Sequence, residues 1–437
     1  SCALYVARDI LGAIYNEPDT QTSEVQDTSR EGGDMAQNSA GGVGFGSVVS
    51  SLFGGDAGKK PGAARVPNRG GALSNVYWAN LIPALLLIAY GLVVVWSASL
   101  SNANASLPRQ ALGAVIGLAV AALIWHWDYR SLANMSTWLL VIDVIIMISP
   151  RIPGLASAAN GMTGWVKLGP LRFQPSEVGK LVTIFLMASL CAQFNGRIKE
   201  FRDYVKLCAT LLVPFAAIMC QPDLGTGLIL IVTGAAIIIC AGARTDWVVI
   251  TLILFVIGCA LIIFVSLNYG FPLKQYQLNR LLVFADSSLE STSAGYNLQQ
   301  AKIAVGSGGL FGKGIGAATQ SAGGFLPENH TDFIFARLSE EFGFAGALIL
   351  LALYAWLIFS ALRLAMKLEA PFAKLVLAGV VAMWSYQLLQ NVGMCIGIMP
   401  ITGIPLPFIS FGSSSMLTQL ICVGIVQSVW RHRQKAA

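Results

Sequence analysis

Ten long apolar segments occupy most of the sequence after residue 75. They lie near 76–98, 109–127, 136–150, 176–194, 206–221, 224–242, 246–268, 333–362, 373–398 and 406–430. A helix needs about 20 predominantly apolar residues to cross the hydrocarbon core of a bilayer. Charged residues make up only 11% of the chain, whereas about a quarter of a soluble globular protein is charged. We therefore expect an all-α polytopic integral membrane protein with about ten transmembrane helices and a long extracellular loop between helices 7 and 8.

The first 74 residues have a different composition, rich in Gly, Ser, Asp and Asn. Such a composition predicts a disordered cytoplasmic tail, and the apolar core of a signal peptide is missing from it. The chain begins at Ser1, and Met35 offers a later start, so residues 1–34 are interpreted as a candidate gene-boundary artefact. Residues 75–430 then form the transmembrane domain, and 431–437 form a short basic cytoplasmic tail.

Basic residues in the short loops predict the orientation. With ten spans they all fall on one side of the membrane, which the positive-inside rule identifies as the cytoplasm. Both termini are thus expected in the cytoplasm, in a bacterial cytoplasmic membrane, and the net charge of +6 reflects topology. The basic residues form no continuous stripe, so the sequence does not predict a nucleic-acid partner. The residues are Lys59, Lys60, Arg65, Arg69, Arg130, Arg197, Lys199, Arg202, Lys206, Arg244, Arg363, Lys367, Lys374, Arg431, Arg433 and Lys435.

Polar residues at the outer ends of the spans mark candidate sites, since charge in or beside an apolar span costs roughly 2.5–3.5 kcal/mol. One cluster precedes and begins the fourth span, with Lys167, Gln174, Ser176, Glu177 and Lys180. Pro175 fits the first position of a helix, and Glu177 fits its first turn. Two interpretations stay open, a helix cap with an interfacial lysine and a substrate-facing pair of opposite charges.

Two further motifs have a structural and a functional interpretation. Asp223 enters the sixth span and is either a helix N-cap or part of a binding cavity. The glycine-rich run 306–316 lacks the GxxxxGK[ST] order of a nucleotide-binding loop, because Gly314 follows Lys313. No nucleotide cofactor is therefore expected. The run is either a structural turn or a loop whose backbone N–H groups approach a pyrophosphate beside Lys313.

The densest polar cluster lies at the start of the eighth span and contains Gln320, Glu328, His330 and Asp332. Eight Cys without CxxC spacing and three scattered His argue against a zinc site. Oxygen ligands leave a divalent cation, Mg²⁺ or Mn²⁺, open. The last outer loop, 399–411, holds Ser410 after three prolines, and its structural interpretation is a stiff hairpin.

Together these motifs resemble the SEDS family (shape, elongation, division and sporulation) of RodA and FtsW type, with wording closer to RodA. The resemblance covers about 75–437. The matching stretches are WVKLGPLRFQPSEVGKL from Trp165, QPDLGTG from Gln221, GYNLQQAKIAVGSGGLFGKGIG from Gly295, TQSAGGFLPENHTDFIFA from Thr319, EEFGFAG from Glu340 and MPITGIPLPFISFGSSSML from Met399.

The resemblance implies a peptidoglycan glycosyltransferase that polymerises lipid II at the outer membrane face, for cell elongation or division. It also implies a class B penicillin-binding protein as partner, undecaprenyl-linked glycan as ligand, and other elongasome or divisome proteins as associates. Such a reaction needs a general base for the acceptor hydroxyl, and positive charge or a metal for the pyrophosphate leaving group.

The family's catalytic carboxylate belongs to a pattern close to R-x-x-x-F-x-x-P-x-x-D-P-x-G-x-G-Y. Aligned on Arg280 and Gly295-Tyr296, the pattern places its Asp at Glu290, with Ser at both Pro positions. The resemblance therefore implies Glu290 as general base, with Asp286 as second candidate and a solvated loop acid as the structural alternative. It further implies Lys167, Lys180, Arg280 and Lys313 as groups that neutralise pyrophosphate.

Two other classes of function remain open from the sequence. A flippase for lipid-linked precursors would also use polar residues and Pro- or Gly-broken spans. The concentration of polar groups on one side favours catalysis at a membrane face over a path through the midplane. A non-catalytic scaffold gives no reason for so many outer charges.

Overall fold

All ten apolar segments contain helices in the computed structural model, which describes residues 75–152, 156–159, 162–168, 171–221, 223–270, 273, 277–278, 280, 283 and 293–433. The helices are α3 (Trp78–Ser101), α4 (Leu107–His126), α5 (Ser136–Ile148), α6 (Pro175–Ala192), α7 (Phe201–Met219), α8 (Leu224–Cys240), α9 (Thr245–Tyr269), α13 (Ile334–Lys367), α14 (Pro371–Ile396) and α15 (Ser413–His432). Within the described residues, six are long and apolar enough to cross a membrane: α3, α4, α6, α9, α13 and α14. The predicted all-α polytopic fold is confirmed.

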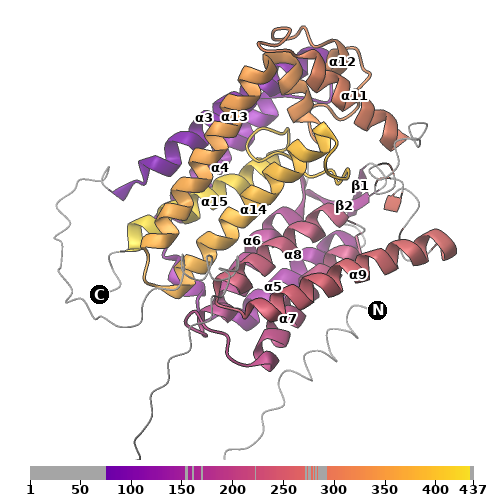
Figure 1. Cartoon of the computed structure of the whole chain (residues 1–437). Coiled ribbons are helices and arrows are strands. Elements are labelled where there is room, and N and C mark those ends of the chain that lie inside the picture. Colours follow the sequence, from indigo (N-terminus) through magenta and orange to yellow (C-terminus); the bar gives the residue numbers. More distant parts are fainter. Residues whose placement is uncertain are drawn as a thin grey trace, which may run out of the picture.

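The bundle consists of two groups of helices that α14 joins (Figure 1). In one group, α3 packs on α13 and α4 packs on α15, so the beginning and end of the described chain lie together. In the other, α5 packs on α6 and α7 packs on α8. Helix α14 contacts α13 on one side and both α6 and α8 on the other. The core therefore lies along α14, where Trp384 is fully buried.

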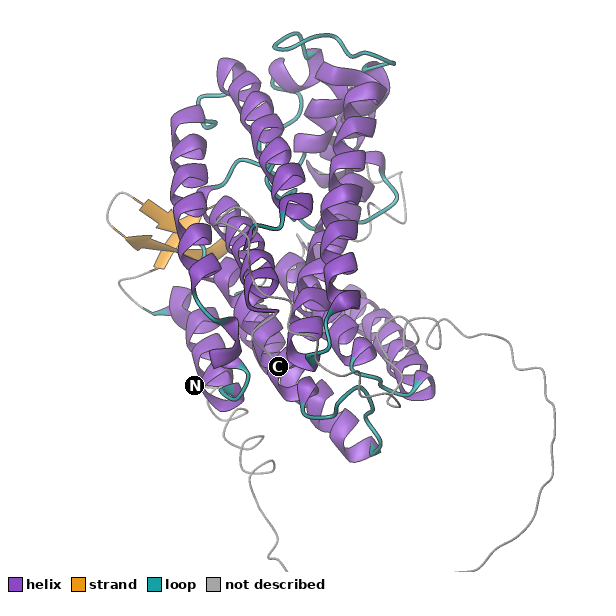
Figure 2. Cartoon of the chain, turned by 90° about the vertical axis from the view of Figure 1, so that its left-hand side faces the viewer, coloured by secondary structure: helices purple, strands orange, loops and turns teal. Residues whose placement is uncertain are grey.

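A small antiparallel sheet, which the sequence pattern did not predict, follows α5 and precedes α6 in the chain (Figure 2). Its strands are β1 (Ala156–Ala159), β2 (Met162–Leu168) and β3 (Leu171–Phe173), in the order β1-β2-β3. Val166 on β2 pairs with both Ala156 and Phe173, and its side chain is buried. The strand β2 also contacts α6, so the sheet covers the start of that helix.

Two short helices lie in the long loop that was expected between the seventh and eighth spans. They are α11 (Ser293–Ser307) and α12 (Thr319–Ala322), and α11 packs against both α13 and α14. These two helices lie at the top of the bundle in the view of Figure 1.

Helix α13 is broken at Gly343, and the glycine-rich run fills the break. Gly343 has φ 66° and ψ −163°, a region that essentially only glycine occupies. The N–H groups of Lys313 and Gly314 donate to the carbonyls of Glu340 and Glu341, each at 3.0 Å. In return, the N–H groups of 344 and 345 donate to the carbonyls of 309 and 310, each at 2.9 Å. The run thus satisfies the backbone groups that the break exposes.

Helices α3 and α15 are tied together at one end of the bundle. The N–H of Tyr77 donates to the side-chain oxygen of Gln427 at 2.7 Å, and the Gln427 amide donates back to the Tyr77 carbonyl at 3.0 Å. Ser428 donates to the carbonyl of Trp127 at 2.6 Å, which adds the end of α4. Both ends of the described chain therefore lie at the same end of the bundle, as an even number of crossings requires.

Helix α9 contacts the rest of the described bundle mainly near its start, where the Tyr204 hydroxyl donates to Thr251 at 2.8 Å and Trp247 packs against Phe201 and Tyr204. Ser266 is its one buried residue, and its most apolar window has a mean hydropathy of 3.3 with none of it buried. A helix that is apolar on every side suits a lipid environment on every side. The predicted tail 1–74 and residues 434–437 of the predicted tail 431–437 lie outside the described residues.

Candidate functional site

A buried ion pair lies at the start of α6. Pro175 is at the first turn, which fixes φ and needs no hydrogen-bond acceptor there. The ammonium of Lys180 lies 2.8 Å from Oε1 of Glu177, with side-chain exposures of 1% and 3%. Glu177 Oε2 and the hydroxyl of Ser176 are buried and have no hydrogen-bond partner in the described part of the chain. Burial of both charges argues against an interfacial lysine. A substrate-facing role of the pair stays a prediction, to which these two atoms could contribute because buried polar atoms are normally paired.

Two neighbours complete this region. The N–H of Gln174 donates to the hydroxyl of Ser414 at 3.2 Å, which ties the start of α6 to the start of α15. On the other side, Thr183 donates to Asp143 Oδ2 at 2.6 Å, while Asp143 Oδ1 has no partner among the described residues. We did not select Asp143 from the sequence. A lone carboxylate inside the apolar segment 136–150 was the signal that should have identified it.

A second cluster of charges lies where the beginnings of α8 and α13 meet the loop 397–412. A Cβ placed on Gly403 would lie 3.1 Å from Asp332 Oδ2 and 3.6 Å from a guanidinium nitrogen of Arg280, so these two groups converge over this glycine. Burial raises the pKa of Asp332 to about 6; the charge of Glu328 also raises it, Arg280 opposes the rise, and Asp223 adds to it. We call Asp223, Arg280, Glu328 and Asp332 the outer charge cluster.

Asp223 also has the structural role that its position suggested. Its carboxylate accepts from the N–H of Thr226 at 3.0 Å and from the Thr226 hydroxyl at 2.7 Å, which caps α8. A Cβ on Gly225 would lie 2.8 Å from the carbonyl of Thr402. The capped turn therefore packs against the outer loop, and the two interpretations of Asp223 are compatible.

Ser410 and His330 hold the outer loop in place. The hydroxyl of Ser410 donates to the carbonyl of Thr331 at 2.7 Å and accepts from the N–H of Leu406 at 2.8 Å. The carbonyl of His330 accepts from the N–H of Phe411 at 2.9 Å. Burial lowers the pKa of His330, against the charge of Glu328. The Ser410 hydroxyl and the His330 carbonyl therefore position the loop beside the outer charge cluster.

Asn391 and Gln110 are positioning residues that sequence reasoning missed. The Asn391 amide donates to the carbonyls of Asp332 and Ile404, each at 2.8 Å. The Gln110 amide donates to the carbonyl of Ser410 at 3.1 Å and accepts from the N–H of Gly412 at 3.0 Å. Amide side chains inside apolar helices are costly unless they are paired, and that cost was the available signal.

The contacts of Lys313 are with residues other than those of the outer charge cluster. Its ammonium donates to Glu340 at 2.8 Å, to Ser307 at 2.8 Å and to Thr319 at 2.7 Å. Glu340 also accepts from the N–H groups of Gln320 and Ser321, at 2.9 and 3.1 Å. These contacts, and the use of the run's N–H groups to fill the break in α13, support the structural-turn interpretation of residues 306–316.

Three of the predicted residues lie wholly or partly outside the described residues. Glu290 and Asp286 lie there entirely, and for Lys167 only the backbone is described, paired with Arg172 between β2 and β3. Among the described residues, no group of three or more His, Cys, Asp or Glu side chains has the geometry of a metal site. Mg²⁺ or Mn²⁺ binding therefore stays a prediction.

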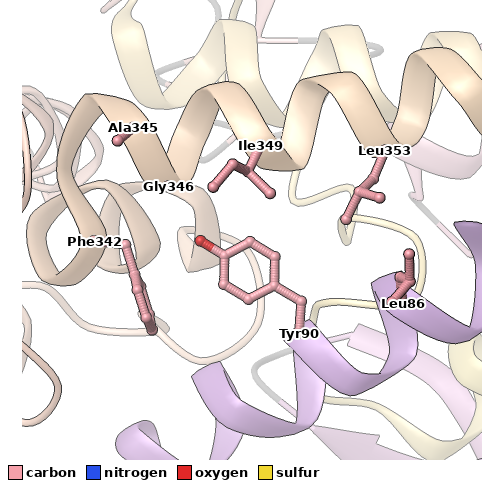
Figure 3. A pocket seen from close by; sticks show the side chains of 7 residues that line it. All are labelled: Leu86, Tyr90, Phe342, Ala345, Gly346, Ile349 and Leu353. Atoms are coloured by element: carbon pink, nitrogen blue, oxygen red, sulfur yellow. The ribbon is translucent and has the colours of Figure 1, made fainter.

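An apolar groove of about 470 Å³ between α3 and α13 is a separate feature (Figure 3). Tyr90 projects from α3 toward α13, and its ring meets that of Phe342 edge-on at 5.4 Å. The rest of the lining is Leu86, Ala345, Gly346, Ile349 and Leu353. Such a lining offers no carboxylate, amine or imidazole for acid–base chemistry.

The sequence of this chain is similar to those of several known proteins. The sequence model of a family described as cell cycle protein, FTSW_RODA_SPOVE, matches residues 77–435. Stage V sporulation protein E of Bacillus subtilis (strain 168) is 35% identical over 80% of this chain and 96% of its own length. Peptidoglycan glycosyltransferase MrdB of Escherichia coli (strain K12) is 32% identical over 81% of this chain and 93% of its own length.

Solved structures agree with these relatives. A chain of a peptidoglycan synthase complex, studied for its coordination of polymerization and crosslinking, aligns with a TM-score of 0.68 and 27% identity, covering 82% of this chain and 98% of that one. Rod shape determining protein RodA of Thermus thermophilus aligns with a TM-score of 0.60 and 25% identity, covering 82% of this chain and 97% of that one.

Proposed function

Because the chain belongs to the FtsW, RodA and SpoVE family of cell cycle proteins, we propose that it is a peptidoglycan glycosyltransferase that polymerises lipid II. Its relative MrdB bears that enzyme name, and the motifs of this chain resemble those of RodA more than those of FtsW. The chain is a polytopic membrane protein. The proposal places both termini in the cytoplasm and the outer charge cluster at the outer membrane face.

One observation carries the proposal: two sets of charges suited to a diphosphate-linked sugar lie at the helix ends around the outer loop. Arg280 converges with Asp332 in the outer charge cluster, and Lys180 pairs with Glu177 at the start of α6. Arg280 and Lys180 supply positive charge for a pyrophosphate leaving group. The unpartnered Glu177 oxygen is an acceptor for a sugar hydroxyl or amide.

The proposed reaction joins two lipid-linked molecules. The 4-hydroxyl oxygen of the acceptor sugar attacks the anomeric carbon of the donor, and the bond from that carbon to the pyrophosphate oxygen breaks. The leaving group departs with the bonding electrons as undecaprenyl pyrophosphate. The proton of the attacking hydroxyl passes to the general base, for which we propose Glu290, with Asp286 second.

Two further elements belong to the proposal. The peptidoglycan synthase complex to which the fold is similar couples polymerization with crosslinking, which supports a class B penicillin-binding protein as partner here. A divalent cation would neutralise the pyrophosphate, and the carboxylates of the outer charge cluster are oxygen ligands of the type that Mg²⁺ and Mn²⁺ prefer.

The decisive experiment is polymerisation of lipid II by the purified full chain with its penicillin-binding protein, with Mg²⁺ and Mn²⁺ varied. Glu290→Gln should abolish glycan formation and leave the thermal unfolding midpoint unchanged, because the substitution keeps the side chain's size and removes its basicity. Asp286→Asn is the matched control and should retain activity. Full activity in Glu290→Gln with loss in Asp286→Asn would move the base to Asp286.

The same preparation tests the flippase alternative, which the buried carboxylates of α5 and α6 favour. Reconstituted in vesicles with fluorescent lipid II, the wild type should form polymer and show no faster translocation than empty vesicles. Translocation that persists in both carboxylate variants, without any polymer from wild type, would replace the glycosyltransferase proposal.

A further inference from the structure

Arginines and aromatic rings meet at the end of the bundle opposite the outer charge cluster. The rings of Tyr77 and Trp430 stack with centroids 4.5 Å apart and planes 22° apart. The guanidinium of Arg433 lies 3.0 Å from the centroid of Trp430, and that of Arg363 lies 4.7 Å from the centroid of Phe359. We call Tyr77, Phe359, Arg363, Trp430 and Arg433 the arginine–aromatic patch.

Two helix ends and the last third of a third helix form the patch. The Tyr77 hydroxyl donates to the carbonyl of Ser360 at 2.9 Å, which fixes the start of α3 against α13. Tyr77 also stacks on Trp430, the ring over which the Arg433 guanidinium lies, and Ser360 lies one helical turn before Arg363 on α13, so Tyr77 links the two arginine sites. The patch is therefore a convergent pair of cations on a rigid aromatic base.

The two arginines are not neutralised within the described part of the chain. Neither Arg363 nor Arg433 forms an ion pair there, whereas Arg244 at the start of α9 lies 2.9 Å from Asp246 while stacking on Trp247 at 5.1 Å. The patch and the Arg244 site thus both combine arginine with an aromatic ring, but only at the Arg244 site does a carboxylate neutralise the arginine.

The surface beside the patch is apolar and exposed. Trp78 on α3 is 46% exposed, and Trp356 and Phe359 on α13 are 45% and 50% exposed. Tryptophan and tyrosine are enriched where lipid headgroups meet hydrocarbon. A lipid whose anionic headgroup lies at the arginines would therefore place its hydrocarbon chains against these rings.

We propose that the arginine–aromatic patch binds the phosphate of an anionic phospholipid headgroup, with the acyl chains along α3 and α13. Guanidinium groups match phosphate oxygens in a bidentate geometry, and the missing counter-charge and adjacent apolar surface fit a lipid better than a soluble anion. The proposal is independent of the catalytic role, because the patch lies at the other end of the helices.

Native mass spectrometry of the full chain in detergent, titrated with phosphatidylglycerol or phosphatidylcholine, tests this inference. Wild type should bind phosphatidylglycerol more tightly. Arg363→Gln combined with Arg433→Gln should weaken that binding about 30-fold, which is ~2 kcal/mol at roughly 1 kcal/mol per arginine. Arg244→Gln is the matched control and should leave binding unchanged. Arg363→Lys should retain most of it.

Three results would overturn the inference: equal affinity of wild type for both lipids, unchanged phosphatidylglycerol binding in the double variant, or displacement of the lipid by millimolar inorganic phosphate. Should the double variant fail to fold, Arg363→Gln alone decides, because Arg363 is exposed and its removal spares the Tyr77 contacts. That single variant should weaken phosphatidylglycerol binding about fivefold. Polymerisation in detergent should be unaffected, which separates this test from the catalytic one.

Discussion

Gly343→Ala should detach the glycine-rich run from α13. At φ 66° and ψ −163°, a residue with a Cβ is strained by about 1–3 kcal/mol. The new Cβ would clash with the Gly312 nitrogen and lie 2.7 Å from the Leu310 carbonyl oxygen. Losing two of the hydrogen bonds across the break adds about 1–3 kcal/mol, at roughly 0.5–1.5 kcal/mol each. The junction should therefore lose about 2–6 kcal/mol of local stability.

Hydrogen exchange followed by mass spectrometry measures this loss locally. Amides of 309–314 and 340–345 should exchange at least about 30-fold faster in Gly343→Ala, which corresponds to the lower end of the range. Gly306→Ala is the matched control: Gly306 lies in α11, and a Cβ there would meet open space. If both variants exchange like wild type, or both change equally, the break in α13 does not depend on glycine and the reasoning is refuted.

Two further predictions concern the charged groups. The pKa of Asp332 is raised from 3.8 to about 6, so the folded state holds this proton more tightly than the unfolded state, and its contribution to stability is lost as pH rises from 3.8 through 6. His330, whose pKa is lowered, changes stability with pH in the opposite direction. The Asp332 effect is therefore measured as the difference in unfolding midpoint between wild type and Asp332→Asn across pH 4–7. A difference that does not vary with pH would contradict the prediction. Lys180→Met should destabilise the fold by about 3–5 kcal/mol, because it leaves Glu177 charged and buried. Adding Glu177→Gln should recover most of that loss in the same unfolding assay. No recovery would show that the lysine acts through packing alone.

The helices were predictable from the sequence because the membrane requires a long apolar run wherever a chain crosses it. The third segment, 136–150, became α5 at Ser136–Ile148, and the seventh, 246–268, became α9 at Thr245–Tyr269. The last segment began too early, since its first residues form the proline-rich loop before Ser413. Hydropathy does not distinguish an apolar residue in a buried loop, such as Phe408, from an apolar residue in a buried helix.

The sheet and the filling of the α13 break were not predictable in this way. Strands β1 to β3 are short, and pairing between Val166 and Phe173 depends on tertiary contacts with α6. The fit of Lys313 and Gly314 to the carbonyls of Glu340 and Glu341 joins segments far apart in the chain. Glycine composition indicated a turn or a phosphate loop, and only the partners of the N–H groups distinguish the two.

Asp143 and Asn391 show what local sequence reasoning overlooked in the site. Each is fully buried in a helix, and each was treated as part of an apolar run. The cost of burying one polar side chain is readable from sequence, but its partner is not. Thr183 for Asp143, and the two carbonyls for Asn391, come from other elements.

The isolation of α9 has a consequence for sequence variation. Core helices such as α14 must conserve side-chain shape, because each substitution there opens a cavity or a clash. Ser266 is its one buried residue. Apart from Trp247 and Thr251, which contact α7, α9 has to keep only its length and apolar character. Homologous proteins should therefore exchange Leu, Ile, Val and Phe freely along this helix, and it is the span best suited to carry a fluorescent or spin label without perturbing the fold.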